Sequence, residues 1–192
     1  NLNTARYTAG GAGTRDASLI FGGYNSGNIA NTESYNGSTF SEVSDLNDTR
    51  GAMGDGGTPS SAMCAGGESP GQTSASESWT EVNDLNNPRR SLCGTGTSTA
   101  ALCFGGYDGE VNLNTESWNG TSWTELNDLS GPKGWGGAFG TYTSAIASQT
   151  TTVEDWNGTS WTSGVSNSDS KSNRSGNGTT AAGMLTSGEP PS

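Results

Sequence analysis

The 192-residue chain contains no histidine, only eight lysines and arginines, and a hydrophobic fraction of 29%. Without histidine, a Ser-His-Asp or Cys-His catalytic mechanism is excluded. The net charge is −11, so the basic surface that neutralises phosphates is missing and we expect no nucleic-acid partner. No apolar run approaches the roughly 18 residues that span a bilayer, so we expect no membrane insertion.

Cysteine is also scarce, and the three copies have neither CxxC spacing nor a histidine that would complete a zinc site. Cys64 and Cys103 stand at equivalent places, each shortly before a glycine pair, and we expect both to be small buried apolar residues. Cys93 and Cys103 flank the segment 97–99 symmetrically. The sequence therefore leaves two alternatives for Cys93 and Cys103, a disulfide bond or two free thiols in the core.

The aromatic residues, by contrast, recur in one phrase. Its fullest copy covers residues 115–129 and places Trp118 and Trp123 on the two sides of Asn119-Gly120. Asn-Gly is the strongest signal for a two-residue type I′ hairpin, whose central residues both need positive φ. The phrase thus predicts two short strands joined at this turn. Further copies occupy residues 33–46, 77–85 in shortened form, and 154–161.

Two other short segments precede each aromatic phrase. In the first repeat, a small-residue segment covers residues 7–14 after Arg6, and an apolar segment ending in a glycine pair covers residues 18–24. Runs of four to eight residues between turn signals are typical of strands. No long segment shows the apolar period of a helix, so the sequence predicts an all-β chain.

Two sequence markers keep one period along the chain. Basic residues at positions 6, 50, 90, 133 and 174 are separated by 44, 40, 43 and 41 residues. The first residue of the glycine pair, or its substitute, lies at 22, 66, 105, 148 and 187, with separations of 44, 39, 43 and 39. Four short strands in a repeat of this length are the organisation of a propeller blade.

This order of a basic residue, a Gly-Gly strand and two aromatics about five residues apart resembles the kelch repeat over nearly the whole chain. The phrase Glu-Ser-Trp-Asn-Gly-Thr-Ser-Trp is similar to kelch-like arrays in predicted bacteriophage structural proteins and in secreted proteins of aquatic bacteria. The resemblance implies one domain over residues 1–192, a kelch-like β-propeller of about five blades of four antiparallel strands, with the first and last blades incomplete. The expected blades cover about 6–46, 50–85, 90–129, 133–165 and, in part, 174–188. Copper-oxidase chemistry, known in some kelch propellers, does not carry over because it needs histidine ligands.

Five inner halves of blades are matched by only four aromatic hairpins. The chain begins with Asn1 rather than Met, and residues 1–6 resemble the end of an outer strand. We therefore expect a segment of a longer polypeptide, with completion of the ring by a neighbouring subunit as the second alternative.

Residues that recur in every repeat are expected to have structural roles. The tryptophans of the phrase are predicted to pack the blades, and the recurring basic residues are predicted to tie neighbouring blades together through carbonyls or carboxylates. These packing residues are Trp79, Trp118, Trp123, Trp156 and Trp161, with Arg6, Arg50, Arg90 and Arg174 and with Lys133 in the fourth repeat. Catalytic carboxylates are usually singular, so we expect the repeated Glu33, Glu77, Glu116 and Glu154 to cap turns or face solvent.

Residues that do not recur are the candidates for ligand binding. Trp135 stands on a predicted inner strand where other repeats carry small residues, so it is placed to line the central channel or its mouth and stack on a sugar. Asp55, Asp108 and Glu110 are the acidic residues outside the repeat pattern. Carboxylates of this kind are typical calcium ligands, but no EF-hand or RTX-type spacing is present. We therefore predict no cofactor.

The sequence favours a noncatalytic structural or adhesion module on a virion or an extracellular surface. Its loops would contact a host glycan or a partner protein, within a homo-oligomer or a larger assembly of virion or surface proteins. The alternative is a carbohydrate-active hydrolase or lyase that uses carboxylates near the central channel. Several asparagines start Asn-x-Ser/Thr sequons, and turn chemistry explains three of them without glycans. They are Asn36, Asn47, Asn119, Asn157, Asn173 and Asn177.

Overall fold

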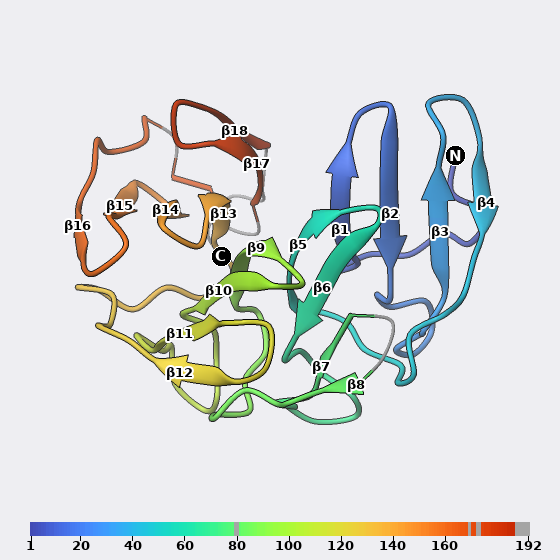
Figure 1. The fold of residues 1–192 in the computed structure, drawn as a ribbon, viewed down its shortest axis with the longest axis horizontal. Coiled ribbons are helices and arrows are strands. Elements are labelled where there is room, and N and C mark those ends of the chain that lie inside the picture. Colours follow the sequence, from blue (N-terminus) through green and yellow to red (C-terminus); the bar gives the residue numbers. More distant parts are fainter. Residues whose placement is uncertain (79–80, 169, 172–173, 187–192) are drawn as a thin grey trace.

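The computed structural model describes residues 1–78, 81–168, 170–171 and 174–186 (Figure 1). All regular secondary structure in these ranges is β, arranged as four four-stranded antiparallel sheets and one two-stranded sheet. The prediction of an all-β chain is confirmed in these ranges, and that of four short strands per repeat is confirmed for the first four repeats. Because no helix forms in these ranges, none is present that is long and apolar enough to cross a membrane.

The strands of each sheet follow one another in chain order, and each is antiparallel to the one before it. Sheet 1 contains β1 (Gly10–Thr14), β2 (Ala17–Phe21), β3 (Thr32–Tyr35) and β4 (Phe40–Glu42). Sheet 2 contains β5 (Gly54–Thr58), β6 (Ser61–Ala65), β7 (Ser76–Glu77) and β8 (Glu81–Val82). Sheet 3 contains β9 (Cys93–Thr97), β10 (Ala100–Phe104), β11 (Thr115–Trp118) and β12 (Trp123–Glu125). Sheet 4 contains β13 (Gly137–Thr141), β14 (Ser144–Gln149), β15 (Thr152–Trp156) and β16 (Trp161–Ser163), and sheet 5 contains β17 (Ser175–Thr179) and β18 (Ala182–Thr186).

The sheets are arranged like blades around a common centre, with β1, β5, β9 and β13 nearest to it and the fourth strands at the outside (Figure 1). The first strands of consecutive sheets, from β1 through β17, pack directly against one another. Three apolar clusters fill the spaces between sheets 1 and 2, sheets 2 and 3, and sheets 3 and 4. This distribution explains how a chain with few apolar residues builds a core, since each thin layer needs only seven to nine buried side chains.

The inner strands approach one another so closely that glycine is required. A Cβ atom on Gly94 of β9 would lie 2.7 Å from the backbone nitrogen of Asp55 on β5. The fourth residue of every inner strand is a glycine with φ between 112° and 121°, a region that side-chain-bearing residues rarely occupy. These five glycines are Gly13, Gly57, Gly96, Gly140 and Gly178.

The hairpin at Asn119-Gly120 differs from the predicted two-residue turn. Trp118 pairs with Trp123, so four residues form the loop, and among them only Gly120 has a positive φ, of 92°. The Asn119 side-chain oxygen accepts hydrogen bonds from the amides of Thr121 and Ser122, both at 2.9 Å. The type I′ prediction is therefore wrong, because the loop has four residues and a single positive φ, and the asparagine side chain adds to the backbone bond from the Asn119 amide to Ser122 O at 3.3 Å.

The ends of the repeat series also differ from expectation. The first sheet has all four strands, so the expectation of an incomplete first blade is wrong. Residues 1–6 lie beside its third strand, where the Asn3 amide donates to Glu33 at 2.7 Å. The fifth sheet has two strands in the part of the chain that the structure describes.

The three cysteines are free and buried, so the disulfide alternative is wrong. The turn between β9 and β10 consists of residues 98–99, which pairs Cys93 with Phe104 and Cys103 with Gly94. A shift of one residue turns side chains to opposite faces of a sheet, and the two thiols lie in different apolar clusters. Burial raises the pKa of Cys93 to about 12, as it does for Cys64, so both thiols stay protonated.

Candidate functional site

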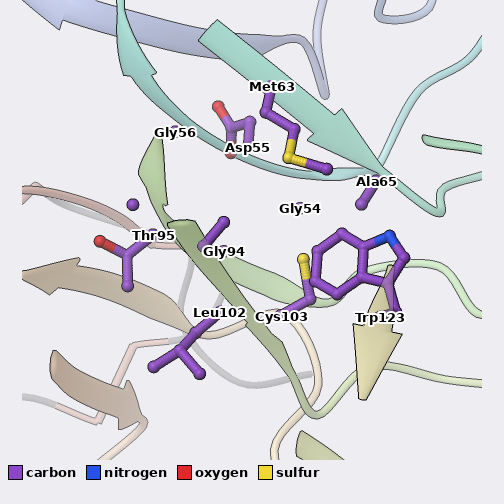
Figure 2. Close-up of a pocket in the computed structure, with 12 residues that line it drawn as sticks. Gly54, Asp55, Gly56, Met63, Ala65, Gly94, Thr95, Leu102, Cys103 and Trp123 are labelled. Atoms are coloured by element: carbon purple, nitrogen blue, oxygen red, sulfur yellow. The ribbon is translucent and has the colours of Figure 1, made fainter. Parts of the chain in front are cut away.

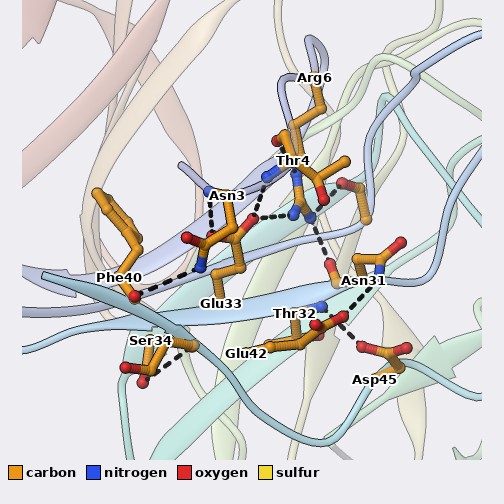
Figure 3. A network of polar contacts seen from close by, with 12 residues as sticks. Asn3, Thr4, Arg6, Asn31, Thr32, Glu33, Ser34, Phe40, Glu42 and Asp45 are labelled. Carbon is orange, nitrogen blue, oxygen red and sulfur yellow. Dashed lines mark hydrogen bonds and ion pairs between the residues drawn. The ribbon is translucent and has the colours of Figure 1, made fainter. Parts of the chain in front are cut away.

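Each of the first four repeats buries an ion pair between the basic residue before its first strand and a glutamate on its third strand. No side chain in these pairs is more than 4% exposed. The pairs are Arg6–Glu33, Arg50–Glu77, Arg89–Glu116 and Lys133–Glu154. Figure 3 shows the first pair, in which Glu33 also accepts the amides of Asn3 and Thr4. The expectation that these carboxylates face solvent is therefore wrong.

Two of these carboxylates have shifted acidities. Burial raises the pKa of Glu33, but the amides of Asn3 and Thr4 and the Arg6 guanidinium lower it, and the net shift is downward. The pKa of Glu154 is likewise lowered on balance, because hydrogen bonds from Ser130 and the charge of Lys133 outweigh burial. Both groups are therefore held ionised as structural anions.

In the second, third and fourth pairs, the basic residue contacts two consecutive repeats. The Arg50 amide donates to Ile29 O at 3.2 Å and the Arg50 carbonyl accepts from Gly23 at 2.7 Å, both in repeat 1. Its guanidinium donates to Ala75 O at 2.7 Å and to Glu77 at 2.5 Å, both in repeat 2. Arg50 therefore links sheets 1 and 2 by hydrogen bonds at both ends of the residue.

In the third repeat the buried position belongs to Arg89 and not, as predicted, to Arg90. With this change the basic residues at 6, 50, 89 and 133 are separated by 44, 39 and 44 residues, so the spacing still agrees with that of the glycine pairs to within one residue. Arg90 is instead 34% exposed, pairs with Glu68 at 3.0 Å and lies over the Tyr107 ring at 5.3 Å. In the fifth repeat, Arg174 Nε donates to Lys171 O at 2.9 Å.

The tryptophans of the aromatic phrase pack against each other within a sheet and, in one case, against the preceding sheet. Trp118 and Trp123 are buried with ring centroids 5.4 Å apart, and Trp156 and Trp161 repeat the arrangement at 5.3 Å. Trp161 also packs edge-on against Phe104 of the preceding sheet at 4.7 Å. Trp79 lies outside the described residues.

A series of backbone hydrogen bonds joins four consecutive repeats near the centre of the molecule. The amide of Ala52 donates to Thr8 O at 3.0 Å, that of Ser91 to Ala52 O at 2.7 Å, and that of Trp135 to Ser91 O at 3.0 Å. All four residues are left-handed, with φ between 52° and 55°. We call these residues, together with Tyr7, Tyr24, Glu68, Arg90 and Tyr107 beside them, the inner rim.

Trp135 is the exception among the left-handed residues of the inner rim. Positive φ is unfavourable for a bulky side chain, and the other three positions carry Thr, Ala and Ser. Trp135 lies two residues before β13 rather than on it, is 39% exposed, and has its ring centroid 5.6 Å from that of Tyr107. Backbone strain of this kind concentrates at functional sites, which makes the Trp135–Tyr107 pair the strongest candidate.

The inner rim also has polar groups next to this pair. Asp108 and Glu110 lie on the exposed loop that follows Tyr107. One Asp108 oxygen accepts from Asn112 at 2.8 Å, and the Asp108 amide donates to Glu110 O at 3.2 Å. Three of the four residues predicted from sequence as ligand-binding, Trp135, Asp108 and Glu110, thus lie on or beside the rim.

Asp55 lies elsewhere. It stands on β5, where its carboxylate accepts the Gly11 amide of β1. Burial raises its pKa to about 6, although the Gly11 hydrogen bond acts in the opposite direction. No cluster of three or more acidic or cysteine side chains suited to a metal exists among the residues that the structure describes.

Two cavities lie between sheets rather than at the inner rim. The first, of about 10 Å³, is lined by Asp55, Met63, Cys103 and Trp123 between sheets 2 and 3 (Figure 2) and is at most large enough for one water. The second, of about 350 Å³, lies between sheets 4 and 5 and is lined by Phe139, Asn167, Ser168, Arg174, Gly183 and Leu185.

Three aromatic residues of the inner rim are absent from the sequence-based site. Tyr24 and Tyr107 each follow a glycine pair, and Glu68 has the same place in repeat 2, so repeat alignment contains the signal. Tyr7 follows the basic marker Arg6 directly. These residues lie together because of β-bridges such as the one between Tyr7 and Tyr24. Such bridges cannot be inferred from composition.

The sequons also differ in their surroundings. Asn47 Nδ2 donates to the buried Glu77 carboxylate at 3.0 Å, so this amide group already has a structural partner. Asn36, Asn119 and Asn157 lie at exposed hairpin turns, where each side-chain oxygen accepts two backbone amides. Asn173 lies outside the described residues.

The fold and the inner rim define a repeat protein of consecutive four-stranded sheets with an exposed aromatic site. No family model matches the chain, and no curated protein matches it.

Proposed function

We propose that the chain is a kelch-like β-propeller that acts as a noncatalytic binding module on a virion or an extracellular surface. A propeller is supported by the meander order within each sheet and by the packing of the first strands around a centre. The two-stranded fifth sheet continues this series. The aligned basic residues, glycine pairs and aromatic phrases support the kelch type. An acidic, repetitive module of this kind fits assembly with other surface proteins, as a homo-oligomer or within a larger structure.

The ligand of this module is a glycan, held at Trp135 and Tyr107. The observation that carries this proposal is an exposed tryptophan in a strained left-handed conformation, with its ring against a tyrosine. Aromatic faces combine a large apolar area with little conformational freedom, which suits the C–H face of a sugar ring. Arg90 and Asp108 nearby offer a donor and an acceptor for sugar hydroxyls.

The placement of the carboxylates supports a noncatalytic role. A glycoside hydrolase needs two carboxyl groups flanking one bond, roughly 5–10 Å apart. Asp55, with its raised pKa, has the character of a general acid, but its carboxylate is bound by the Gly11 amide between β1 and β5. Asp108 and Glu110 belong to the loop after β10 instead.

The test is a glycan array probed with the unaltered protein, Trp135→Ala and Tyr142→Ala. Tyr142 is the matched control, because it is 45% exposed and follows the other end of the same strand, β13. We expect binding to at least one glycan by the unaltered protein and by Tyr142→Ala, and at least tenfold weaker binding by Trp135→Ala, about the loss expected for one stacked ring. Equal binding by all three would overturn the proposal.

A further inference from the structure

We infer that the inner rim holds a second aromatic contact, formed by Tyr7 and Tyr24, and that one extended, uncharged polysaccharide chain occupies both contacts. This inference rests on the proposed glycan binding at Trp135 and Tyr107. It specifies the ligand as a polymer rather than a single terminal sugar.

The second contact has nearly the same geometry as the first. The Tyr7 and Tyr24 ring centroids are 5.2 Å apart at 41°, compared with 5.6 Å and 41° for Tyr107 and Trp135. Tyr7 is 63% exposed and Tyr24 is 38% exposed. Two backbone hydrogen bonds, of 3.2 and 2.8 Å, hold Tyr7 and Tyr24 opposite each other, so the pair is preorganised.

The hydrogen-bonded series of the inner rim sets the spacing of the two contacts. Thr8, next to Tyr7, is joined to Trp135 through Ala52 and Ser91 by three consecutive backbone bonds. Hydrogen-bonded backbones lie roughly 4.8 Å apart, so the path along the rim is roughly 15 Å. The direct separation of its two ends is at most this length, because the sheets lie around a common centre (Figure 1). A chain of several sugar rings covers this span, whereas a monosaccharide occupies one contact.

Polar groups lie between the two contacts. The Arg90–Glu68 pair, from repeats 3 and 2, is partly exposed on both sides, at 34% and 38%. Such a pair presents both donors and acceptors to hydroxyl groups in the middle of a bound chain. Apolar contacts at both ends and a polar middle match an uncharged polysaccharide.

The charge of the inner rim argues against an anionic polymer. Glu68, Asp108 and Glu110 lie on or beside the rim, while Arg90 is already paired with Glu68. The whole chain carries a net charge of −11. A polyanion would therefore be repelled rather than steered to the rim.

If the two contacts bind one chain, a polymer should bind with higher affinity than a short oligosaccharide that reaches only one contact. Once one contact is occupied, the second binds intramolecularly, which raises affinity by about 10²-fold or more. Removing Tyr7 should abolish this gain without changing the binding of a short oligosaccharide at Trp135. Tyr7 is the better position to change because most of its side chain is in solvent.

The experiment compares the unaltered protein with Tyr7→Ala, Tyr7→Phe, Trp135→Ala and Tyr142→Ala. Affinity electrophoresis measures binding to uncharged mixed-linkage β-glucan, xylan and galactomannan, with heparin as the anionic comparison. Calorimetry measures binding of disaccharides from the same uncharged polymers, which are shorter than the span. Thermal unfolding checks that every variant is folded. We expect Tyr7→Ala to bind the polymer about 10²-fold more weakly and the disaccharides unchanged, and Tyr7→Phe, which keeps the ring, to match the unaltered protein.

Each other result has a defined meaning. Unchanged polymer binding by Tyr7→Ala, together with loss by Trp135→Ala, overturns the two-contact inference and leaves the proposed function standing. Unchanged binding by Trp135→Ala overturns the proposed function as well. Stronger binding to heparin than to the uncharged polymers, or no binding to any uncharged polymer, overturns the assigned ligand class.

Discussion

Arg89 Nη1 lies 2.6 Å from Glu116 Oε1, and both side chains are at most 1% exposed. This contact uses a single guanidinium nitrogen, which also donates to Asn87 O at 3.3 Å. The Arg89 Nε and Nη2 atoms are buried and have no partner among the described residues. Lys133 serves the fourth repeat with one nitrogen, at 3.1 Å from Glu154.

We therefore expect Arg89→Lys to leave the free energy of unfolding within about 1 kcal/mol of the original, since it keeps the one nitrogen in use and removes two unsatisfied ones. Arg89→Met should lose about 3–5 kcal/mol, because it leaves the Glu116 carboxylate buried without its cation. Urea unfolding at neutral pH measures both. Equal losses for lysine and methionine would show that the guanidinium shape, rather than its charge, is required.

The all-β class and the repeat were predictable because they depend on local signals. Glycine pairs, basic markers and paired aromatics recur within each repeat, and the strand-length runs between them contain no helical period. The buried ion pairs were harder to foresee. Glu116 is 27 residues away from Arg89 in sequence, and only the meander of sheet 3 brings its carboxylate to the segment that enters the repeat.

The site was predicted in part for the same reason. Trp135 stands out in the sequence because its counterparts are small, whereas its contact with Tyr107 depends on the hydrogen-bonded series that joins different repeats. Arg90 was predicted in place of Arg89 because residue type alone cannot show which of two adjacent arginines is the buried one. Their environments differ completely, since Arg89 is fully buried and Arg90 is partly exposed.

Gly96 tests the requirement for glycine on the inner strands. Its φ is 118°, and an added Cβ would lie 2.6 Å from the Ala101 Cα. Gly96→Ala should therefore destabilise the protein by more than about 2 kcal/mol, since strain and overpacking add. Gly71→Ala is the matched control, because Gly71 has an ordinary φ and open space around it. We expect its thermal midpoint to stay the same or rise slightly, and an equal drop for both variants would contradict the argument.

Asp55 makes stability depend on pH in the opposite sense from most carboxylates. Its pKa is raised from 3.8 to about 6 by burial, so the folded state holds this proton more tightly than the unfolded state does. The contribution of Asp55 to the free energy of unfolding should fall as pH rises from about 4 to about 7, by at most about 3 kcal/mol. Asp55→Asn keeps an acceptor for the Gly11 amide but removes the titration.

The measurement is urea unfolding of both proteins across this pH range. Glu33 and Glu154 have lowered pKa values, so their contributions are lost only as pH falls below about 4.5, and they affect both proteins equally. The stability gain from Asp55→Asn should therefore increase with pH. A difference that is constant with pH would show that Asp55 titrates normally in the folded protein.

Trp123 and Trp161 occupy equivalent places but differ in one hydrogen bond. Trp161 Nε1 donates to Thr115 Oγ1 of the preceding sheet at 2.9 Å, whereas Trp123 Nε1 is buried with no partner among the described residues. Ser76 is the counterpart of Thr115, but its hydroxyl is directed to Ser74 O at 3.4 Å. Thr32, the counterpart in sheet 1, donates in the same way to Ala30 O at 3.5 Å, so this orientation is open to both residue types. Serine rotates more freely about χ1 than threonine.

Ser76→Thr should reduce the rotation of the hydroxyl, and the Thr115 orientation is favoured here because it satisfies the buried Trp123 donor. We expect the variant to be more stable by about 1 kcal/mol. The buried Thr32 and Thr115 show that two other sheets accommodate the added methyl group at this position. The reverse change, Thr115→Ser, should destabilise by a similar amount, because it frees the acceptor of Trp161. Chemical unfolding measures both variants, and loss of stability in Ser76→Thr would show that the sheet 2–3 layer is packed too tightly for the methyl group.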